Sequence, residues 1–396
     1  MKLFRRRALA QDHDSTSRET LHEAAEEKAL PTKGIVDVPF LLITAALLLF
    51  GCVMVYSASS YNAEIHYGDQ YFFLKKQIIG VVLGAAALVA LSFVNHHKLK
   101  KFKWWAVGIT LVLLGLVFIP GIGIENYGAK RWIGFGGFSI QPSEIAKFVL
   151  VFFCAVHLSE NFENVKTFKA IFPPLCVGGA FCALVIIEPN MSITICMAMV
   201  LFVMLFIGGL AKKHFMWLGS AAAVAMPLLI ILEPYRVKRL MAFVDPWASP
   251  QGEGFQLIQS LYALGAGGLF GVGLFESRQK YLFLPFSESD FIFSIIAEEL
   301  GFFGCAFILG VYLVLVILLI KVARRASTRY GALLATGIAA VIAIQTILNI
   351  AVISGSIPPT GLPLPFISAG STSLMVFMGA IGIALNIYKD SKKNII

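Results

Sequence analysis

The sequence predicts an all-α polytopic membrane protein. Of its 396 residues, 58% are hydrophobic and 14% are charged, whereas soluble domains carry about 25% charged residues. Several apolar runs are long enough to cross roughly 30 Å of hydrocarbon as helices. By hydropathy these runs predict about ten transmembrane helices, near residues 38–57, 77–94, 104–123, 141–158, 170–187, 191–209, 214–233, 291–320, 330–355 and 367–388.

The distribution of Lys and Arg orients these helices in the membrane. With the N-terminus in the cytoplasm, 22 of the 32 basic residues fall in inner segments, 9 in outer segments, and Lys147 lies within a span. Because basic residues concentrate in cytoplasmic loops, both termini are expected in the cytoplasm. The net charge of +9 then serves orientation and contact with anionic head groups, so no nucleic-acid partner is expected.

Three parts are expected along the chain. Residues 1–36 are polar and lack the apolar core of a cleavable signal, which indicates a flexible cytoplasmic tail. Residues 37–390 form the transmembrane domain, and residues 391–396 form a second cytoplasmic tail. Between the seventh and eighth helices, residues 234–290 are expected to form a large extracellular loop, whose length favours function or disorder. All six cysteines lie in predicted spans without a CxxC motif, so apolar packing is expected for them.

Four polar clusters lie near the outer ends of the spans, and the first is GAKRWIGFGGFSIQPSEIAKF, residues 128–148. Charges inside a bilayer are costly, so each needs a reason. The proline of QPSE suits the first turn of a helix, whose free amides favour an anion. Glu144 and Lys147 share one face of that helix. With Lys130 and Arg131 they could hold a phosphate-bearing head group. The alternative is a structural Glu–Lys pair inside the bundle, with Arg131 reaching the membrane surface.

The second cluster is IIEPNMS, residues 186–192, a short outer turn between two spans. Pro189 and Asn190 are typical turn residues, and Glu188 stands at the boundary of the membrane. Glu188 could belong to a functional site. Equally, it could be a solvated glutamate of a simple turn.

The third cluster is the long loop, where RLMAFVDPWASPQGEGFQ (239–256) is too polar to cross a bilayer and carries the lone Asp245. The stretch that follows, FQLIQSLYALGAGGLFG, could form an amphipathic helix on the membrane face. Its glycines could cradle a phosphate or simply form a flexible turn. Glu298 and Glu299 begin the next span about 100° apart, so they are not expected to face the same partner, and one is expected to anchor the loop.

The fourth cluster is SGSIPPTGLPLPFISAGSTS, residues 354–373, with four prolines and three glycines at membrane depth. Such a sequence predicts a broken helix, which survives in a membrane only where protein buries it or where it lines a wet cavity. Hydroxyl groups such as that of Ser368 could then face a polar substrate. The alternative is a plain outer loop whose serines cap helices. Together, the clusters predict a polar cleft that opens outward and suits an amphiphile carrying phosphate.

A series of motifs occurs in order along the chain: VMVYSAS (53–59), FLKKQ (73–77), GAKRWI, IQPSEIAK, FVDPW, GGLFGVGL, DFIF, IAEELG and PPTGLPLPFIS. Together they resemble the SEDS family of shape, elongation, division and sporulation proteins, over roughly residues 37–388. The DPW, SRQKY and TGLPLPFIS segments are more similar to the FtsW/SpoVE branch of division and sporulation proteins than to the RodA branch of elongation proteins.

This resemblance implies ten transmembrane helices with a large outer loop between helices seven and eight. It also implies a peptidoglycan glycosyltransferase of the bacterial cytoplasmic membrane that polymerises lipid II for septal or spore cell wall. The implied partners are a class B penicillin-binding transpeptidase and other divisome or sporulation membrane proteins. In the family, the aspartate of the R…F.DP motif is the essential acidic residue, and the matching position here is Asp245. The candidate substrate-binding residues are Lys130, Arg131, Gln141, Ser143, Glu144, Lys147, Glu188, Arg239, Gln256 and Ser368.

The chemistry of polymerisation suits these residue types. The carboxylate of Asp245 could act as general base toward the acceptor sugar 4-hydroxyl as that hydroxyl attacks the anomeric carbon. The leaving lipid pyrophosphate needs cations, which Lys147, Arg131, Lys130 or a divalent metal ion (Mg²⁺ or Mn²⁺) could supply. Glu144 could orient Lys147 or help to coordinate the metal, and no organic cofactor is expected. The rival acids in the same loop are Glu253, Glu288 and Asp290.

The sequence departs from the family pattern at three places. Asn190 stands where the family has Asp in EPD.GT, Phe286 and Ser289 replace the Glu and Thr of LPE..TDFIF, and SAGSTS replaces SYGGSS from residue 368. The lost carboxylates leave two other functions open. One is a non-catalytic scaffold that docks a transpeptidase, and the other is a lipid II flippase, which would also use a polar cleft and broken helices.

Overall fold

The structure of this chain is a computed structural model that describes residues 37–126, 129–135 and 138–393. The chain divides into two compact units, residues 1–39 and 40–396. In the described part, nine helices are long and apolar enough to cross a membrane. They are α2 (Asp37–Tyr67), α3 (Phe72–Phe93), α6 (Pro142–Glu160), α7 (Phe168–Ile187), α8 (Met191–Gly208), α9 (Lys212–Ile231), α12 (Ile292–Arg325), α13 (Arg329–Ile353) and α14 (Ser371–Lys393).

One of the ten predicted spans, 104–123, is shorter than expected. In its place the chain forms α5 (Lys103–Leu116), a helix of 14 residues. A helix of that length extends roughly 21 Å, less than the thickness of the hydrocarbon. The helix ends ahead of Pro120, which disfavours helical backbone at the residue before it, and Gly121 then takes a positive φ of 87°. The strand that follows begins at Gly123.

A small antiparallel sheet, which the hydropathy pattern did not predict, follows α5. Its strands are β1 (Gly123–Asn126), β2 (Ala129–Phe135) and β3 (Phe138–Ile140), paired in the order β1-β2-β3. Ile133 of β2 lies opposite Ile140, the last residue of β3. Only Gln141 stands between Ile140 and the start of α6. The sheet therefore leads directly into α6, which begins at Pro142 as the QPSE sequence predicts.

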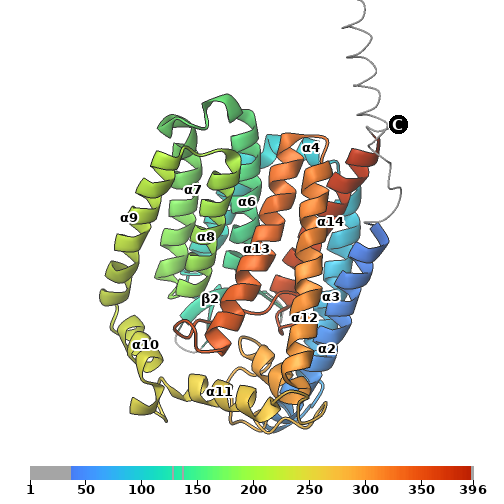
Figure 1. Ribbon diagram of the computed structural model, residues 1–396, viewed down its shortest axis with the longest axis vertical. Helices are drawn as coiled ribbons and strands as arrows, with labels where there is room; N and C mark the ends of the chain where they lie inside the picture. Colours follow the sequence, from blue (N-terminus) through green and yellow to red (C-terminus); the bar gives the residue numbers. More distant parts are fainter. Residues whose placement is uncertain (1–36, 127–128, 136–137, 394–396) are drawn as a thin grey trace, which may run out of the picture. The chain divides into compact units, whose positions relative to one another are not determined.

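The connection between α9 and α12 is partly helical. It contains α10 (Pro234–Val244), the 3₁₀ turn η3 (Pro246–Ala248) and α11 (Phe255–Gly267). A helix is therefore present in the stretch after residue 255, where the sequence suggested one. Figure 1 shows α10 and α11 at one end of the bundle, while α4 (His96–Leu99) lies at the other end.

The glycines after α11 let this loop pack on the backbone of α12. A Cβ added at Gly267 would lie 1.9 Å from Ala297 O, and one added at Gly271 would lie 2.1 Å from Glu299 O. Gly301 breaks α12 with φ 65° and ψ −167°. The interrupted backbone then bonds to the loop, with Val272 N donating to Glu298 O at 2.9 Å. Gly267 and Gly271 thus serve close packing, whereas a Cβ added at Gly265 or Gly268 would meet nothing within 4 Å.

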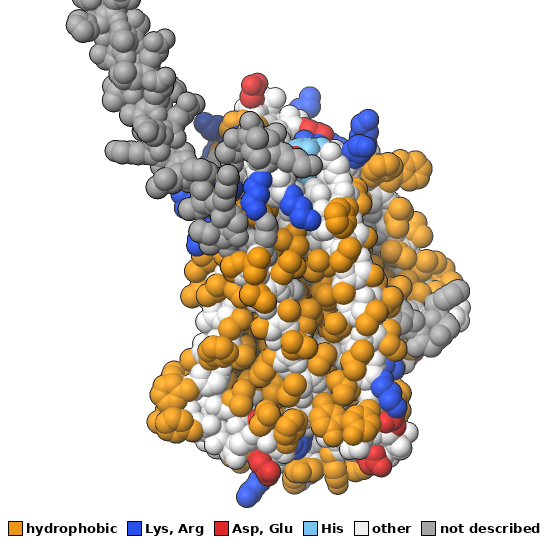
Figure 2. All heavy atoms as spheres, turned by 90° about the vertical axis from the view of Figure 1, so that its right-hand side faces the viewer, with side chains coloured by type: hydrophobic (Ala, Val, Ile, Leu, Met, Phe, Trp, Pro, Cys, Tyr) orange, Lys and Arg blue, Asp and Glu red, His pale blue; other side chains and the backbone are white. Residues whose placement is uncertain are grey.

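Side-chain burial separates the helices of the bundle. In the most apolar 18-residue stretch of each helix, 72% of the residues are buried in α14 and 67% in α6, whereas no residue is buried in α9. Figure 2 shows hydrophobic side chains over the middle of one face, with Lys and Arg side chains gathered toward its upper end. This distribution is typical of a multi-pass membrane protein. Helix α14 continues to Lys393, past the predicted boundary at residue 390, while the predicted tail 1–36 and residues 394–396 lie outside the described residues.

Candidate functional site

A cavity of about 1080 Å³ lies at the α10 end of the bundle. Its walls come from α3, the sheet, the α7–α8 turn, α9, α10, the segment before α12 and the segment between α13 and α14. The charged and amide side chains that line it are Lys76, Gln77, Glu125, Arg131, Gln141, Asn190, Arg236, Arg239, Gln256, Glu288 and Asp290. Four cations and three carboxylates thus face a space large enough for a sugar diphosphate.

Non-helical backbone forms one wall of this cavity. Residues 357–363 line the cavity, as do residues 369–373, which lead into α14. Side chains of the bundle helices donate hydrogen bonds to backbone carbonyl groups in and just after the first stretch. Gln345 Nε2 donates to Pro363 O and Asn349 Nδ2 to Leu362 O, each at 2.7 Å, while the Tyr312 hydroxyl donates to Pro365 O. These bonds explain how broken helix is tolerated at membrane depth. The expectation that this segment lines a cavity is confirmed.

The two arginines of the predicted site bind backbone carbonyls at the cavity wall. Arg131, on β2, donates from Nε to Glu188 O at 3.3 Å and from Nη2 to Pro189 O. Arg239, on α10, donates from Nη1 to Pro359 O at 3.1 Å. Each arginine has five N–H donors, so these bonds orient the guanidinium groups and leave donors for a ligand.

Asp290 is a carboxylate of the cavity wall on which the charges of both arginines act. Burial raises the pKa of Asp290 to about 6, and the charges of Arg131 and Arg239 oppose that rise. Burial also raises the pKa of Glu288, which lines the same wall. The acid that the sequence identified only as a rival therefore faces the cavity directly.

Asp245 lies outside the residues that line the cavity. It follows the last residue of α10 and caps η3, with Oδ1 accepting from Trp247 N at 3.1 Å and Ala248 N at 3.3 Å. Its side chain is exposed. Arg239 and Leu240 of the same helix do line the cavity, and Asp245 comes six residues after Arg239, or roughly 9 Å along the axis. Asp245 thus stands beyond the cavity, at the far end of the helix that walls it.

Glu144 and Lys147 lie inside the bundle and do not line the cavity. Lys147 Nζ bonds to Glu144 Oε1 at 2.9 Å, and the two side chains are 1% exposed or less. Lys147 also donates to Gln345 Oε1, and Ser373 Oγ donates to Glu144 Oε2 at 3.0 Å. The arrangement is the structural pair that the sequence left open as the alternative. Ser373 lines the cavity, and so does Pro363, whose carbonyl group accepts from Gln345. The pair therefore supports the cavity wall from inside the bundle.

The remaining predicted residues divide in the same way. Gln141 and Gln256 line the cavity. Ser368 Oγ donates to Ser289 O at 2.6 Å and accepts from Leu364 N, so it holds two segments together. Lys130 and Ser143 are also absent from the lining, and the buried Ser143 hydroxyl has no hydrogen-bond partner within the described part of the chain.

Glu188 is fully buried in the turn between α7 and α8. Neither of its carboxylate oxygens has a hydrogen-bond partner in the described residues. Burial raises the pKa of Glu188 to about 8, against a smaller opposing effect of the Arg131 charge. The solvated turn glutamate considered from the sequence is therefore wrong, and the side chain lies beside the cavity without lining it.

Sequence reasoning missed three charged groups of the cavity: Lys76, Glu125 and Arg236. Lys76 and Gln77 stand in FLKKQ, which had been noted only as a motif. Arg236 donates to Leu229 O at 2.7 Å and to Ile186 O, which ties α10 to the α7 end. The clustering of Arg236, Lys238 and Arg239 in a polar loop was the available signal.

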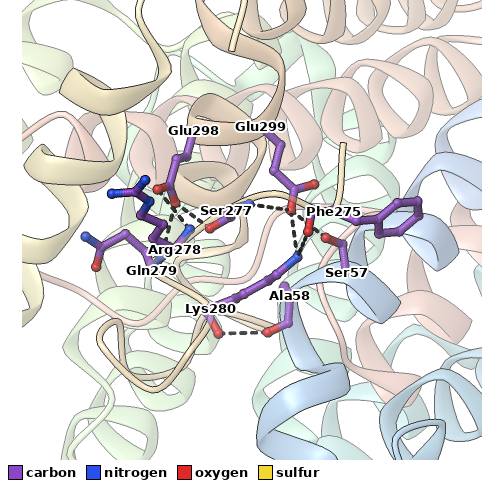
Figure 3. Close-up of polar contacts among 10 residues, drawn as sticks. Ser57, Ala58, Phe275, Ser277, Arg278, Gln279, Lys280, Glu298 and Glu299 are labelled. Carbon is purple, nitrogen blue, oxygen red and sulfur yellow. Dashed lines mark hydrogen bonds and ion pairs between the residues drawn. The ribbon is translucent and has the colours of Figure 1, made fainter. Parts of the chain in front are cut away.

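Both glutamates at the start of α12 hold the turn 275–280 (Figure 3). Glu298 accepts from Ser277 Oγ and from Arg278 N, while Glu299 accepts from Ser277 N and Lys280 Nζ. The expectation that the two face different partners is wrong, because the turn passes between the long side chains and meets both. The expected anchoring of the loop is confirmed, with two anchors in place of one.

Comparison with known proteins identifies the family. The sequence profile of the FtsW–RodA–SpoVE family, described as a cell cycle protein, matches residues 38–393. The chain belongs to this family. Stage V sporulation protein E of Bacillus subtilis (strain 168) is 41% identical to the present chain, and the match covers 90% of this chain and 98% of the relative. A probable peptidoglycan glycosyltransferase FtsW of Geobacter sp. (strain M18) is 39% identical over 89% and 96% of the two chains.

Solved structures of the FtsW–RodA–SpoVE family share the fold. A chain of the structure titled "Structural coordination of polymerization and crosslinking by a peptidoglycan synthase complex" matches with a TM-score of 0.74 and 27% identity, covering 90% of this chain and 98% of that one. The rod shape determining protein RodA of Thermus thermophilus matches with a TM-score of 0.66 at 24% identity, covering 91% and 99%. These matches confirm the polytopic helical fold and the SEDS resemblance.

The departures from the FtsW–RodA–SpoVE pattern have local structural roles. Asn190 caps α8, with Oδ1 accepting from Ile193 N at 3.3 Å, so the amide keeps the acceptor that the family's aspartate would offer there. Phe286 lines the cavity with a positive φ of 57°. The sequence change at 286 thus replaces a carboxylate by an apolar ring in the cavity wall.

Proposed function

We infer that this membrane protein is a peptidoglycan glycosyltransferase that polymerises lipid II. The observation that carries this inference is the cavity itself, in which Arg131, Arg239 and two further cations face carboxylates beside a wall of non-helical backbone. The family assignment and the relatives named as probable peptidoglycan glycosyltransferases support the same activity. The cationic end suits the leaving lipid pyrophosphate, which binds arginine through charge-assisted hydrogen bonds.

In the proposed reaction, the acceptor sugar 4-hydroxyl attacks the anomeric carbon of the donor. The carboxylate of Asp245 accepts the hydroxyl proton, the bond from the anomeric carbon to the pyrophosphate oxygen breaks, and the lipid pyrophosphate leaves with the bonding electrons. Arg131 and Arg239 stabilise the negative charge that grows on the leaving group. Since Asp245 lies beyond the cavity, the acceptor occupies the space between the cavity and the end of α10.

A divalent cation, Mg²⁺ or Mn²⁺, would fit the carboxylate-lined part of this site. Mg²⁺ is usually bound by one or two carboxylates together with substrate phosphates. Asp290 and Glu288 line the cavity and provide such oxygen donors. The metal would supply positive charge at the leaving group.

The proposed partner is a class B penicillin-binding transpeptidase, and the proposed orientation places both termini in the cytoplasm. The structural match to a chain of a peptidoglycan synthase complex supports such a partner. The Lys and Arg bias of the inner segments supports the orientation. Other divisome or sporulation membrane proteins are proposed as further partners on the basis of the family.

The test is a lipid II polymerisation assay with purified protein, with and without a partner and divalent cation. We expect glycan strands from the wild type and from Glu253→Gln, an exposed acid of the same loop, and none from Asp245→Asn. The amide of Asn can still accept the two backbone N–H groups that Asp245 binds, so folding is retained. Strands from Asp245→Asn would remove that residue from the mechanism. Absence of strands from folded wild type under every condition would favour the scaffold, and transport of lipid II without strands would favour the flippase.

A further inference from the structure

A cluster of metal-binding side chains lies at the end of the bundle away from the cavity. One nitrogen of His96, one nitrogen of His97 and a carboxylate oxygen of Asp390 lie within 4.8 Å of one another. The two histidines begin α4, and Asp390 lies in the last turn of α14. Figure 1 places α4 and the C-terminal end of α14 at the same end of the bundle. The cluster therefore joins two segments nearly 300 residues apart in sequence.

Asn386 fixes the protonation pattern of the His96 ring. Its Nδ2 donates to Ser92 O at 3.0 Å, so its Oδ1 is the atom that faces His96. That oxygen lies 2.7 Å from His96 Nδ1 and also accepts from His96 N at 3.2 Å. An amide oxygen can only accept, so Nδ1 carries the proton and Nε2 carries a lone pair. Metal-binding histidines commonly have their second nitrogen held in this way.

The free nitrogen of His96 has no partner in the described structure. His96 is 1% exposed, and its Nε2 is buried without a hydrogen bond. A buried polar atom without a partner destabilises the fold. The centroid of the His96 ring lies 4.0 Å from that of the His97 ring and 5.8 Å from that of the Tyr330 ring. A ligand at this lone pair would satisfy the atom.

His97 and Asp390 already have the spacing of two ligands of one ion. His97 Nε2 lies 3.1 Å from Asp390 Oδ2, and their side chains are 32% and 26% exposed. Ligand atoms about 2.0–2.2 Å from a tetrahedral Zn²⁺ lie roughly 3.3 Å from one another. Ser327 Oγ donates to Asp390 Oδ2 at 2.5 Å, which orients the carboxylate. The partial exposure leaves a path for an ion and a water molecule.

We propose that His96, His97 and Asp390 form a Zn²⁺ site that fastens the α3–α4 turn to the end of α14. Two imidazole nitrogens and a carboxylate oxygen are ligands that Zn²⁺ takes in proteins, and solvent completes the four-coordinate shell. Asn386 and Ser327 act as positioning residues. The site stabilises the packed pair α3 and α14, whose opposite ends contribute Lys76 and Ser371 to the cavity.

Metal content of the purified full chain tests this proposal without an activity assay. The protein is prepared with an affinity tag that lacks histidine, dialysed against buffered Zn²⁺ and analysed by elemental mass spectrometry. We expect about one Zn²⁺ per wild-type chain and a thermal unfolding temperature that falls on chelation. His97→Ala and Asp390→Asn should lose the ion and show no response to chelator. His66→Ala, which removes an exposed histidine elsewhere, should bind as the wild type does.

A second variant distinguishes a preorganised Zn²⁺ site from non-specific Zn²⁺ binding. Asn386→Ala keeps all three ligands but removes the bond that fixes His96, and it should weaken Zn²⁺ affinity roughly 10–100-fold. Visible absorption of bound Co²⁺ should report a four-coordinate site in the wild type that His97→Ala abolishes. Wild-type protein without stoichiometric metal would overturn the proposal, and so would equal binding by the wild type, His97→Ala and Asp390→Asn.

Discussion

Lys147 and Glu144 form a 2.9 Å ion pair inside the bundle, and both side chains are 1% exposed or less. The pair joins three helices, because Lys147 donates to Gln345 of α13 and Glu144 accepts from Ser373 of α14. Charged groups this deep are stable only while each remains paired, since an isolated buried charge lacks both water and a counter-ion. The pair therefore holds the cavity wall in place.

Lys147→Met should destabilise the protein by about 3–5 kcal/mol, because it leaves the Glu144 carboxylate buried and unpaired. The double variant Glu144→Gln/Lys147→Met removes both charges and should recover much of that loss. Chemical unfolding of the detergent-solubilised protein measures both values. A single variant no less stable than the double variant would contradict this account of the pair.

Polymerisation should depend on the ionisation of Asp290. The pKa of Asp290 is raised to about 6, so its carboxylate is charged above that pH and neutral below it. If the charged form holds the divalent cation, the rate should fall as the pH drops through about 6. Asp290→Asn should slow the reaction and remove that part of the pH profile. Glu253→Gln is the control, and a wild-type acid limb that survives in Asp290→Asn would exclude this role.

Folding stability should depend on pH through Glu188. Its pKa is raised from 4.5 to about 8 in the folded chain, so the folded state keeps a proton that the unfolded state has released. Glu188 therefore contributes stability below its unfolded pKa, and that contribution is lost as the pH rises through 8. Thermal unfolding from pH 5 to 9 should show a decline in the wild type and a smaller one in Glu188→Gln. Parallel profiles would show that Glu188 does not retain the proton.

Gly271→Ala should loosen the loop from α12. Its new Cβ would lie 2.1 Å from Glu299 O, and φ is +81°, a conformation that costs a side-chain-bearing residue about 1–2 kcal/mol before the clash. Hydrogen exchange of the amides of residues 271–273 should rise, and proteolysis near 275–280 should quicken. Gly265→Ala is the matched control, because nothing lies within 4 Å of its Cβ position and alanine favours helix. Equal protection in both variants would contradict the packing role.

Hydropathy predicted most of the fold because the membrane imposes one strong length requirement on every span. It overestimated the span 104–123, since an apolar composition continues past Leu116 while Pro120 and the glycines end the helix. It missed the sheet, whose strands have 4, 7 and 3 residues. Such short strands carry too little alternation to be recognised from the sequence.

The site could be predicted only as a set of polar segments that meet. Sequence spacing put Glu144 and Lys147 on one face of a helix, and the structure confirms it, but spacing does not say whether that face meets a cavity or another helix. The bonds from Gln345 and Ser373, more than 190 residues away, decide the matter. Asp290 was recognisable as an acid of the loop, while the effect of the Arg131 and Arg239 charges on it depends on a strand and a helix far along the chain.

Helix α9 supplies Met226 and Ile230 to the cavity wall, yet none of its residues is buried. A substrate with a polyprenyl tail can therefore approach from the plane of the bilayer, and its tail need not leave the lipid. The quantity that governs occupancy is then the mole fraction of substrate among the lipids, not its molarity in the aqueous phase. Adding lipid or detergent at constant total substrate lowers that mole fraction and should therefore lower the rate, as surface dilution does for enzymes that meet their substrates in two dimensions.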